Sequence, residues 1–357
     1  MVARDANESR RPQPHLPQPN LPQQSSVGRR KFMQATAGGA AATFLATRLP
    51  NIVTAAEAPV AAVPESVVKK LYGTLSEAQR KAICFDWDYI DPSRGLLRTR
   101  VSANWNITDK TINSEFFTDE QRDMLREMFL GMIHPDWHAR YDQQLDDDCG
   151  GFGEGQSIAI FGDPTAGKFE LVLSGRHMTL RCDGNSADHV AFGGPIFYGH
   201  APEQTEFKEH PGNVFWHQAV AANQVYEMLD GKQRDVALVA NRPGESRVAF
   251  QGAEGKFPGI AIADLSADQK SHAQQVLEKL IEPFRQSDQD EVVACLKAQG
   301  GLDKCHLAFY SDGDLGEDKV WDNWRLEGPS FVWYFRGSPH VHVWVNIADS
   351  SQVELNA

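Results

Sequence analysis

The sequence predicts an α+β fold, with a mixed, largely antiparallel sheet and flanking helices in a single compact domain. Amphipathic stretches typical of helices are mixed with short runs of valine and aromatic residues that end at glycine or proline. The regular strand–helix alternation that indicates a parallel sheet is missing. Residues 59–357 contain no obvious linker or repeat array, and a segment of that length can bury one large core.

Residues 1–58 have the composition of an export signal rather than of a folded domain. A polar, proline-rich start is followed by the basic segment Gly28–Gln34, a weakly apolar run up to Thr47, and an Ala-x-Ala motif at Ala56–Ala58. The Arg-Arg pair resembles the twin-arginine export signal, with Gly28 where Ser or Thr is usual. The apolar run is too short to span a membrane. We therefore expect a disordered n-region plus a twin-arginine-type signal peptide, export by the twin-arginine machinery to the periplasm or the extracellular space, and no stable transmembrane segment.

Charge and cysteine content argue against three kinds of protein. The formal net charge is −13 and no basic patch occurs beyond the signal, so nucleic-acid binding is not expected. The five cysteines include no Cys-x-x-Cys pair, and neither a zinc ribbon nor a thioredoxin-like site is indicated. Cys295 and Cys305 could form a disulfide after export, or could be small buried residues.

A shared capping motif marks the start of three helices. Ser76, Thr118 and Ser266 each follow Leu or Phe and are followed three residues later by glutamine, the pattern of a capping box with a hydrophobic staple. With the spacing of apolar residues, these caps predict helices at about 65–72, 76–84, 118–132, from Pro135 to about Leu145, 213–229 with Asn213 as N-cap, 266–284 and 288–298.

Short runs rich in β-branched and aromatic residues predict the strands. They lie at about 96–105, 157–161, 168–181, 236–240, 247–250, 260–262, 307–310 and 320–326. Residues 146–155 are rich in aspartate and glycine and are expected to form a loop.

The segment Gly162–Lys168 matches the spacing of a phosphate-binding loop but lacks its chemistry. Phe169 stands where Ser or Thr would hold magnesium, and a strand-like run follows where that motif needs a helix N-terminus. Asp-Pro and Ala-Gly within the segment are ordinary turn residues. The sequence therefore predicts a hairpin turn here.

A β-hairpin is expected near the C-terminus. Two dense apolar runs, 331–335 and 341–345, flank Arg336-Gly-Ser-Pro339. Because strand side chains alternate between faces, His340, His342 and Trp344 should share one face and the intervening valines the other. Two imidazoles two residues apart on one strand can chelate a metal ion.

Several long motifs resemble the family known as domain of unknown function 3500. They are Gly175–Met178, Gly193–His200, His210–His217, the Leu-x-x-x-Gln-Arg helix starts and the Pro339–Val343 end. The resemblance extends over nearly the whole mature chain and implies an exported single domain. The family offers no established activity, and it supports the histidines only because they fall within its motifs.

The histidines in these motifs are the main candidates for chemistry. We take His177, His340 and His342, all on predicted strands, as ligands of a mononuclear metal ion, with His200 or Glu206 as a possible completion. Imidazole nitrogens suit zinc, copper or iron. If these ligands form a site, their nitrogens should converge to within about 4–5 Å of one another.

Other residues are candidates for catalysis or substrate binding. His200 could act as a general base, and Arg176 and Arg336 could bind an anionic substrate or stabilise developing charge. The aromatic residues Phe197, Tyr198 and Trp216 could line a substrate pocket, although such residues commonly form core. His210 could cap the turn that it begins, and His217 could lie on a packed helix face.

Three functions remain open from the sequence. The first is an exported metal-dependent enzyme, an oxidoreductase or a hydrolase. The second is a metal-independent hydrolase or lyase that uses His177 or His200 as general base. The third is a non-catalytic binding protein of the cell envelope. No G-x-S-x-G nucleophile motif of a serine hydrolase is present.

Overall fold

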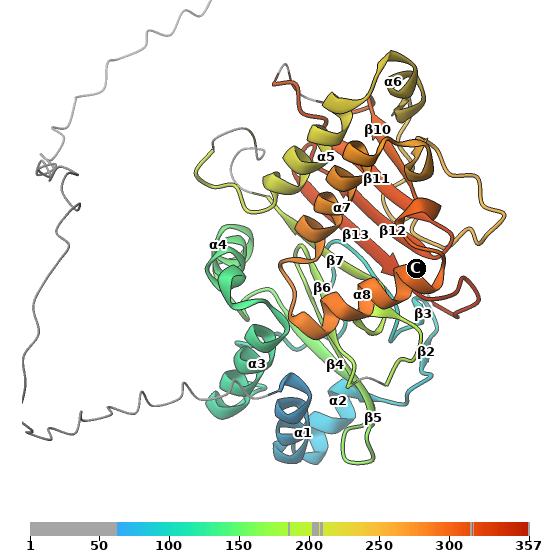
Figure 1. Cartoon of the computed structure of the whole chain (residues 1–357). Coiled ribbons are helices and arrows are strands. Elements are labelled where there is room, and N and C mark those ends of the chain that lie inside the picture. The colour runs from blue at the N-terminus through green and yellow to red at the C-terminus, as the bar shows by residue number, and fades with distance from the viewer. Residues whose placement is uncertain are drawn as a thin grey trace, which may run out of the picture. The chain divides into compact units, whose positions relative to one another are not determined.

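A computed structural model describes residues 63–355, apart from 185, 202–206, 208–209, 315 and 317. The described residues form a single compact α+β domain, as expected (Figure 1). The expected signal peptide, with its Arg-Arg pair, and Glu206 lie outside the described residues.

One large sheet runs through the domain. In spatial order its strands are β1 (Cys84–Phe85), β4 (Ser157–Asp163), β5 (Lys168–Gly175), β6 (Met178–Cys182), β7 (Ile196–His200), β13 (Val341–Ile347), β12 (Phe331–Arg336), β11 (Asn323–Gly328), β10 (His306–Tyr310) and β8 (Leu238–Val239), with β9 (Ile260–Ala261) also paired to β10. β1–β4 and β8–β10 are parallel pairs, and the other neighbours are antiparallel. A separate small hairpin consists of β2 (Ile90–Asp91) and β3 (Gly95–Leu96). The expectation of a mixed, largely antiparallel sheet is therefore confirmed.

Eight α-helices flank this sheet in the described part of the chain. They are α1 (Pro64–Thr74), α2 (Glu77–Ile83), α3 (Asp119–Met132), α4 (His138–Cys149), α5 (Trp216–Met228), α6 (Gly231–Ala237), α7 (Ala267–Ile281) and α8 (Gln286–Ala298). The three capping boxes predicted at Ser76, Thr118 and Ser266 are all present, with both reciprocal hydrogen bonds formed. A fourth, at Asp230, begins α6 and was not predicted.

The two faces of the sheet bury separate apolar clusters. Val341, Val343 and Val345 of β13 belong to the main core, on the face where α5, α7 and α8 lie across β11–β13 (Figure 1). Trp344 belongs to a second cluster on the opposite face, together with Val248 from the segment that follows β8. The predicted alternation along the C-terminal hairpin is therefore confirmed.

Two predicted strands are wrong, because the chain turns or becomes irregular within them. The strand expected at 168–181 folds back on itself as the hairpin β5–β6, whose two-residue turn is Arg176–His177. The strand expected at 96–105 retains only Leu96 as strand residue, in β3. By contrast, the turn predicted at Gly162–Lys168 is confirmed, since it joins the antiparallel strands β4 and β5.

Two helix boundaries also differ from the prediction. α4 continues to Cys149, so Asp146–Asp148 are helical rather than part of a loop, and the helix ends at Gly150 with φ +85°. α5 begins at Trp216, and Asn213 does not cap it; the Asn213 side chain instead contacts the backbone of Phe207.

Two strands predicted after α5 also differ. The strand expected at 236–240 is partly helical, because α6 ends only at Ala237. Residues 247–250, also expected as a strand, have no regular secondary structure.

All five cysteines are free thiols, so the disulfide considered for Cys295 and Cys305 is not formed. Cys295 lies on α8 and Cys305 directly precedes β10. Within the described residues, no helix has the length and apolar composition that crossing a membrane requires.

Candidate metal centre

The C-terminal hairpin supplies two of the three candidate ligands. His342 is the second residue of β13 and is paired with Arg336 of β12 on one side and with Gly199 of β7 on the other. It projects from the same face as Trp344, and both of these side chains contact the ring of Phe197. His340 precedes β13 by one residue, so it lies in the connection between the strands rather than on a strand.

His177 comes from the hairpin turn between β5 and β6 rather than from a strand interior. Its backbone has φ +52°, a left-handed conformation that is uncommon for any residue with a side chain. Two backbone hydrogen bonds hold it there: its N–H donates to Ala103 O (2.9 Å), and its carbonyl accepts from the N–H of Gly199 (3.1 Å). The strained residue is therefore fixed by an irregular segment on one side and by β7 on the other, and such strain is common at functional sites.

Because Gly199 has no side chain, it leaves room for the imidazoles of His177 and His342 to approach each other. It lies between His177 and His342, because it is hydrogen-bonded to the first and paired with the second. A Cβ atom at Gly199 would lie 3.5 Å from the Cβ of His177 and 2.3 Å from Val341 O. The absence of a side chain thus lets two ligand-bearing segments face each other across β7.

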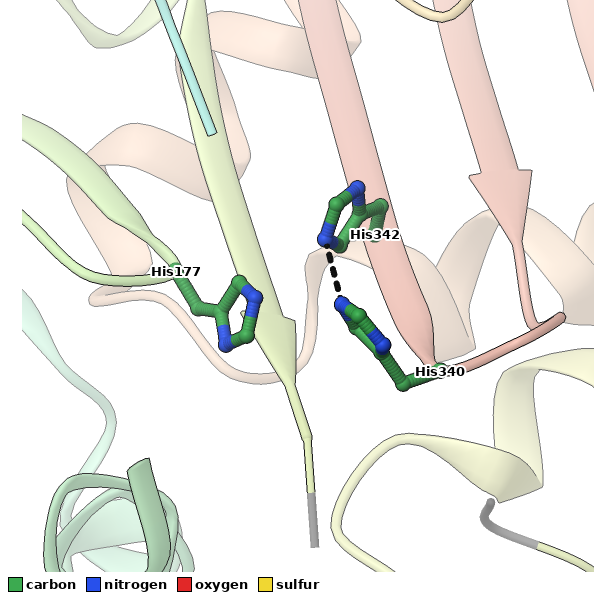
Figure 2. A group of neighbouring side chains, drawn as sticks. All are labelled: His177, His340 and His342. Carbon is green, nitrogen blue, oxygen red and sulfur yellow. Dashed lines mark hydrogen bonds between the residues drawn. The ribbon is translucent and has the colours of Figure 1, made fainter. Parts of the chain in front are cut away.

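The three imidazoles converge as the metal hypothesis requires. One ring nitrogen from each of His177, His340 and His342 lies within 4.8 Å of the other two. The ring of His177 points toward the His340–His342 pair from the other side of β7 (Figure 2). The Nε2 atoms of His340 and His342 are 2.9 Å apart, which is close to the nitrogen separation of about 3.3 Å that tetrahedral zinc–imidazole geometry implies.

Carboxylates lie at the Nδ1 atoms of two of these rings. Glu245 Oε2 lies 2.7 Å from His342 Nδ1, and Asp148 Oδ1 lies 2.9 Å from His177 Nδ1. A carboxylate accepts a hydrogen bond, so it favours the tautomer with the proton on Nδ1 and leaves a lone pair on Nε2. Carboxylate–histidine pairs of this kind accompany ligated histidines in metal sites.

Each carboxylate is itself held in place. Asp148 is buried at the end of α4 and accepts hydrogen bonds from the Gln144 side chain (2.6 Å) and from the backbone N–H of Ala201 (3.0 Å). Burial raises the pKa of Asp148, but His177, together with the hydrogen bonds from Gln144 and Ala201, outweighs burial and holds that pKa below its ordinary value. Asp148 is therefore ionised at neutral pH.

Glu245 has an equivalent partner in Arg336. The Arg336 guanidinium pairs with Glu245 Oε1 and also lies 3.4 Å from the His340 carbonyl. Burial raises the pKa of Glu245, whereas the hydrogen bond of His342 and the charge of Arg336 lower it, and the net pKa lies below the ordinary value. The predicted catalytic residue Arg336 is thus buried beside the histidines and engaged with Glu245.

His340 and His342 are neutral near pH 7, the state in which imidazole binds a metal. Burial, followed by the charges of His342 and His177, lowers the pKa of His340 to about 4. Burial is also the largest cause of the lowered pKa of His342. His177 and His342 are buried, whereas His340 is partly exposed, so the cluster opens toward solvent on the His340 side.

Arg176 lies beside Asp148, the carboxylate partner of His177. Its side chain is 47% exposed, and its Nε is 3.8 Å from Asp148 Oδ1. The cluster therefore has one exposed cation beside it and one buried cation, Arg336, behind it.

His200 directly follows Gly199 on β7, but its side chain lies on the opposite face of this strand from the cluster. Its Nε2 lies 2.9 Å from Asp147 Oδ2, and its side chain is completely buried. Within the described residues it is not part of the group that could share one ion. Glu206, the other residue considered for completing the site, lies outside the described residues.

The predicted substrate-binding residues are divided between the two faces. Phe197 contacts the ring of His342, with centroids 5.1 Å apart. Tyr198 and Trp216 are buried in the main core, where the Tyr198 hydroxyl donates to Gln218 (2.9 Å). Only Phe197 is therefore adjacent to the histidines.

The two remaining candidate histidines have structural contacts. His210 accepts a hydrogen bond from the N–H of Gly212 (3.1 Å) and so caps its own turn. His217 lies on α5 against the ring of Trp137, and its Nε2 is 3.2 Å from Glu282 Oε1.

Sequence reasoning missed Asp148, Glu245 and Gly199. Asp148 falls in a run of three aspartates that follows a predicted helix, and Gly199 interrupts a β-prone run directly before His200. These are weak signals. Glu245 carried no signal, because it is remote in sequence from both His342 and Arg336.

Comparison with known proteins gives one match. The model of a family described as "Protein of unknown function (DUF3500)" matches residues 51–346, which is more than half of the chain. No curated protein and no solved structure matches. The chain therefore belongs to the DUF3500 family of proteins of unknown function.

Proposed function

We propose that this protein binds a single transition-metal ion through His177, His340 and His342 and uses it as a metal-dependent enzyme, either a hydrolase or an oxidoreductase. The observation that carries the proposal is the convergence of three imidazole nitrogens within 4.8 Å, with carboxylates at the Nδ1 atoms of His177 and His342. Three neutral nitrogen ligands suit zinc, copper or iron.

A purely structural role explains the arrangement less well. His340 and His342 already satisfy each other with one hydrogen bond between their Nε2 atoms. The ring of His177, within 4.8 Å of them, adds no hydrogen-bond partner for either. Carboxylates at the Nδ1 atoms of two of the rings, one buried and one partly exposed, are the arrangement that accompanies metal-ligating histidines.

The open side of the cluster supports a catalytic rather than a closed structural centre. Structural zinc sites surround the ion with four protein ligands, whereas catalytic sites keep a position for water or substrate. Three ligands and a partly exposed His340 match the second type. A zinc ion held there would supply a hydroxide near neutral pH. Copper or iron would instead supply redox chemistry.

A metal-independent general base at His200 has less support. The His200–Asp147 distance suits a base and its orienting carboxylate, but the His200 side chain has no exposed surface through which a substrate could reach it. His177 is also nearly enclosed, with 5% of its side chain exposed.

Metal analysis of untagged protein tests the proposal. We expect about one equivalent of zinc, copper or iron per chain by inductively coupled plasma mass spectrometry, after purification without chelators or added metal. His177→Ala and His342→Ala should lose that metal while keeping the far-ultraviolet circular dichroism of the wild type. His272→Ala, at a position on α7 outside the cluster, is the matched control and should retain it.

Reconstitution gives a second readout. The added ion should raise the melting temperature of metal-stripped wild type but not of His342→Ala, because only a protein that binds the ion in its folded state is stabilised by it. If untagged protein contains no metal, and none of the three ions changes its melting temperature, the proposed centre does not exist.

We further propose that the centre works outside the cytoplasm, after export by the twin-arginine machinery. The support is the Arg-Arg pair in Gly28–Gln34 and the Ala-x-Ala motif at Ala56–Ala58. Replacing Arg29 and Arg30 by lysine should leave the full-length precursor in the cytoplasm. Wild-type protein in the periplasm or medium should begin near Pro59 by mass spectrometry, and an uncleaved, cytoplasmic wild type would contradict the proposal.

A further inference from the structure

A cavity lies on the same face of the sheet as the histidine cluster. It has a volume of about 550 Å³ and is bounded by β8, β10 and β11 and by the segment after β8. Tyr310 of β10, a residue of its wall, is in one cross-strand row with Asn323, Arg336 and His342. Three strand spacings of about 4.8 Å place Tyr310 some 14 Å from His342 along the sheet.

Cations outnumber anions around this cavity. Arg242, Arg247 and Arg325 line it, with Glu327 as the one acidic residue among the lining side chains. Arg325 is buried and pairs with Glu327 at 2.8 Å, so these two charges cancel. Arg242 forms an ion pair with Asp312 at 3.5 Å. Arg247 is exposed and makes no ion pair within the described part of the chain, which leaves the cavity with an uncompensated positive charge.

The cavity also has apolar walls and one unpartnered polar group. Val239, Pro243 and Pro258 contribute apolar surface. Tyr310 is 1% exposed, and its hydroxyl has no hydrogen-bond partner among the described residues. Buried polar groups are rarely left in that state, and an ordered water or a bound ion is a usual explanation. The volume is in the range of sites for small organic molecules.

We propose that this cavity binds a small organic carboxylate. The guanidinium groups of Arg242 and Arg247 bind the charged end, since guanidinium matches the geometry of a carboxylate. The apolar part of the ligand packs against Val239, Pro243 and Pro258. The proposal is independent of the metal centre, because none of these residues touches a histidine of the cluster.

The position of the cavity connects it to the cluster through one short segment. Arg242 and Arg247 are on either side of Glu245, the residue that holds His342. Tyr334 also anchors this segment, because its hydroxyl donates to Pro243 O (3.2 Å). This segment therefore contributes residues to both sites, with Glu245 serving the cluster and its neighbours lining the cavity.

Ligand-observed nuclear magnetic resonance with benzoate tests the proposal in the full mature protein. Benzyl alcohol has the same apolar ring without the charge, and inorganic phosphate has charge without the ring. We expect benzoate to bind at least tenfold more tightly than either. Arg247→Gln should weaken benzoate binding about five- to tenfold because a charged hydrogen bond is lost, and Arg247→Lys should restore part of the loss.

Two control variants separate this site from a general charge effect and from the metal centre. Arg140→Gln removes one exposed arginine from α4, and His342→Ala removes a candidate metal ligand; both should bind benzoate as the wild type does. Equal binding of benzyl alcohol, equal binding of phosphate, an unchanged affinity in Arg247→Gln, or no binding of benzoate would each overturn the proposal. Loss of benzoate binding in His342→Ala would move the carboxylate site to the metal centre and would also overturn it.

Discussion

At the scale of single residues, each imidazole of the cluster is positioned by a different device. His342 is fixed by strand pairing and by Glu245, His177 by a left-handed backbone and by Asp148, and His340 by its hydrogen bond to His342. The two carboxylates contribute orientation rather than ligand atoms. Their removal should therefore weaken metal binding without preventing it.

Glu245→Gln tests this distinction. Glutamine keeps the size of the side chain but loses the charge that pairs with Arg336 and the carboxylate that orients His342. We expect the metal affinity to fall about 10- to 100-fold while the stoichiometry at saturation stays at one. Competition with a chromophoric chelator measures the change. Glu254→Gln, in the exposed loop that follows, is the control, and equal affinities for the two variants would show that Glu245 has no such role.

At the scale of elements, the sequence predicted the helices and strands better than it predicted the turns that position the ligands. The fold class, the capping boxes and the C-terminal hairpin follow from local patterns that the tertiary structure did not override. The turn at Arg176–His177 could not be found, since a non-glycine residue at φ +52° is stabilised by its bonds to Ala103 and Gly199 and not by its own preference.

The candidate site shows the same division. The three histidines were identified because they fall in dense β-prone motifs. Their carboxylate partners were not, because Asp148 and Glu245 approach only after folding, from a helix end and from a segment without regular structure. The predicted strand location of His177 and His340 was wrong, yet the convergence expected of them was found.

Gly199→Ala tests the packing of the strand between the ligands. A Cβ atom 2.3 Å from Val341 O cannot be accommodated unless β7 and β13 move apart. We expect the free energy of unfolding to fall by about 1–3 kcal/mol, the usual range for overpacked sites, and metal binding to weaken as well. Urea denaturation measures the first effect. Gly73→Ala in α1, where no atom lies within 4 Å of the added Cβ, should instead leave stability equal or higher, because alanine favours helix.

Ser266→Ala tests a helix cap far from the candidate site. The Ser266 hydroxyl accepts the N–H of Gln269 at 3.3 Å, and its loss should cost about 1 kcal/mol of unfolding free energy. Ser266→Asp keeps an acceptor and should cost much less. Both variants should bind metal as the wild type does, and a change in metal content would mean that the helix start is coupled to the site.

At the scale of the whole molecule, an acidic cluster beside α8 makes stability depend on pH. Burial, together with the charges of Asp183 and Asp288, raises the pKa of Glu291 to about 7, above the ordinary value of 4.5. Between pH 4.5 and about 7, Glu291 is therefore protonated in the folded state but ionised in the unfolded state. The contribution of Glu291 is fully present below pH 4.5 and is lost as the pH rises toward 7.

Glu291→Gln should remove this dependence. The amide cannot ionise and can still accept the hydrogen bond that Phe192 N–H donates to Glu291 at 3.2 Å. We expect the variant to be more stable than the wild type at pH 8, by at most about 2 kcal/mol after allowance for partial solvent screening, and to match it near pH 4.5. Chemical denaturation at the two pH values measures the difference. Glu278→Gln on the exposed face of α7 controls for net charge, and an equal gain there would refute the assignment.

The central place of β7 has a consequence for how the molecule is assembled. His177 belongs to the hairpin β5–β6 on one side of this strand, and His340 and His342 belong to the last hairpin on the other side. Roughly 160 residues of chain separate these ligands, and an ion that joins them closes that long loop as a covalent cross-link would. The hairpin that ends in β13 brings two of the three ligands. A chain cut short before His340 would lack both of them, so metal content would report whether this hairpin has docked beside β7.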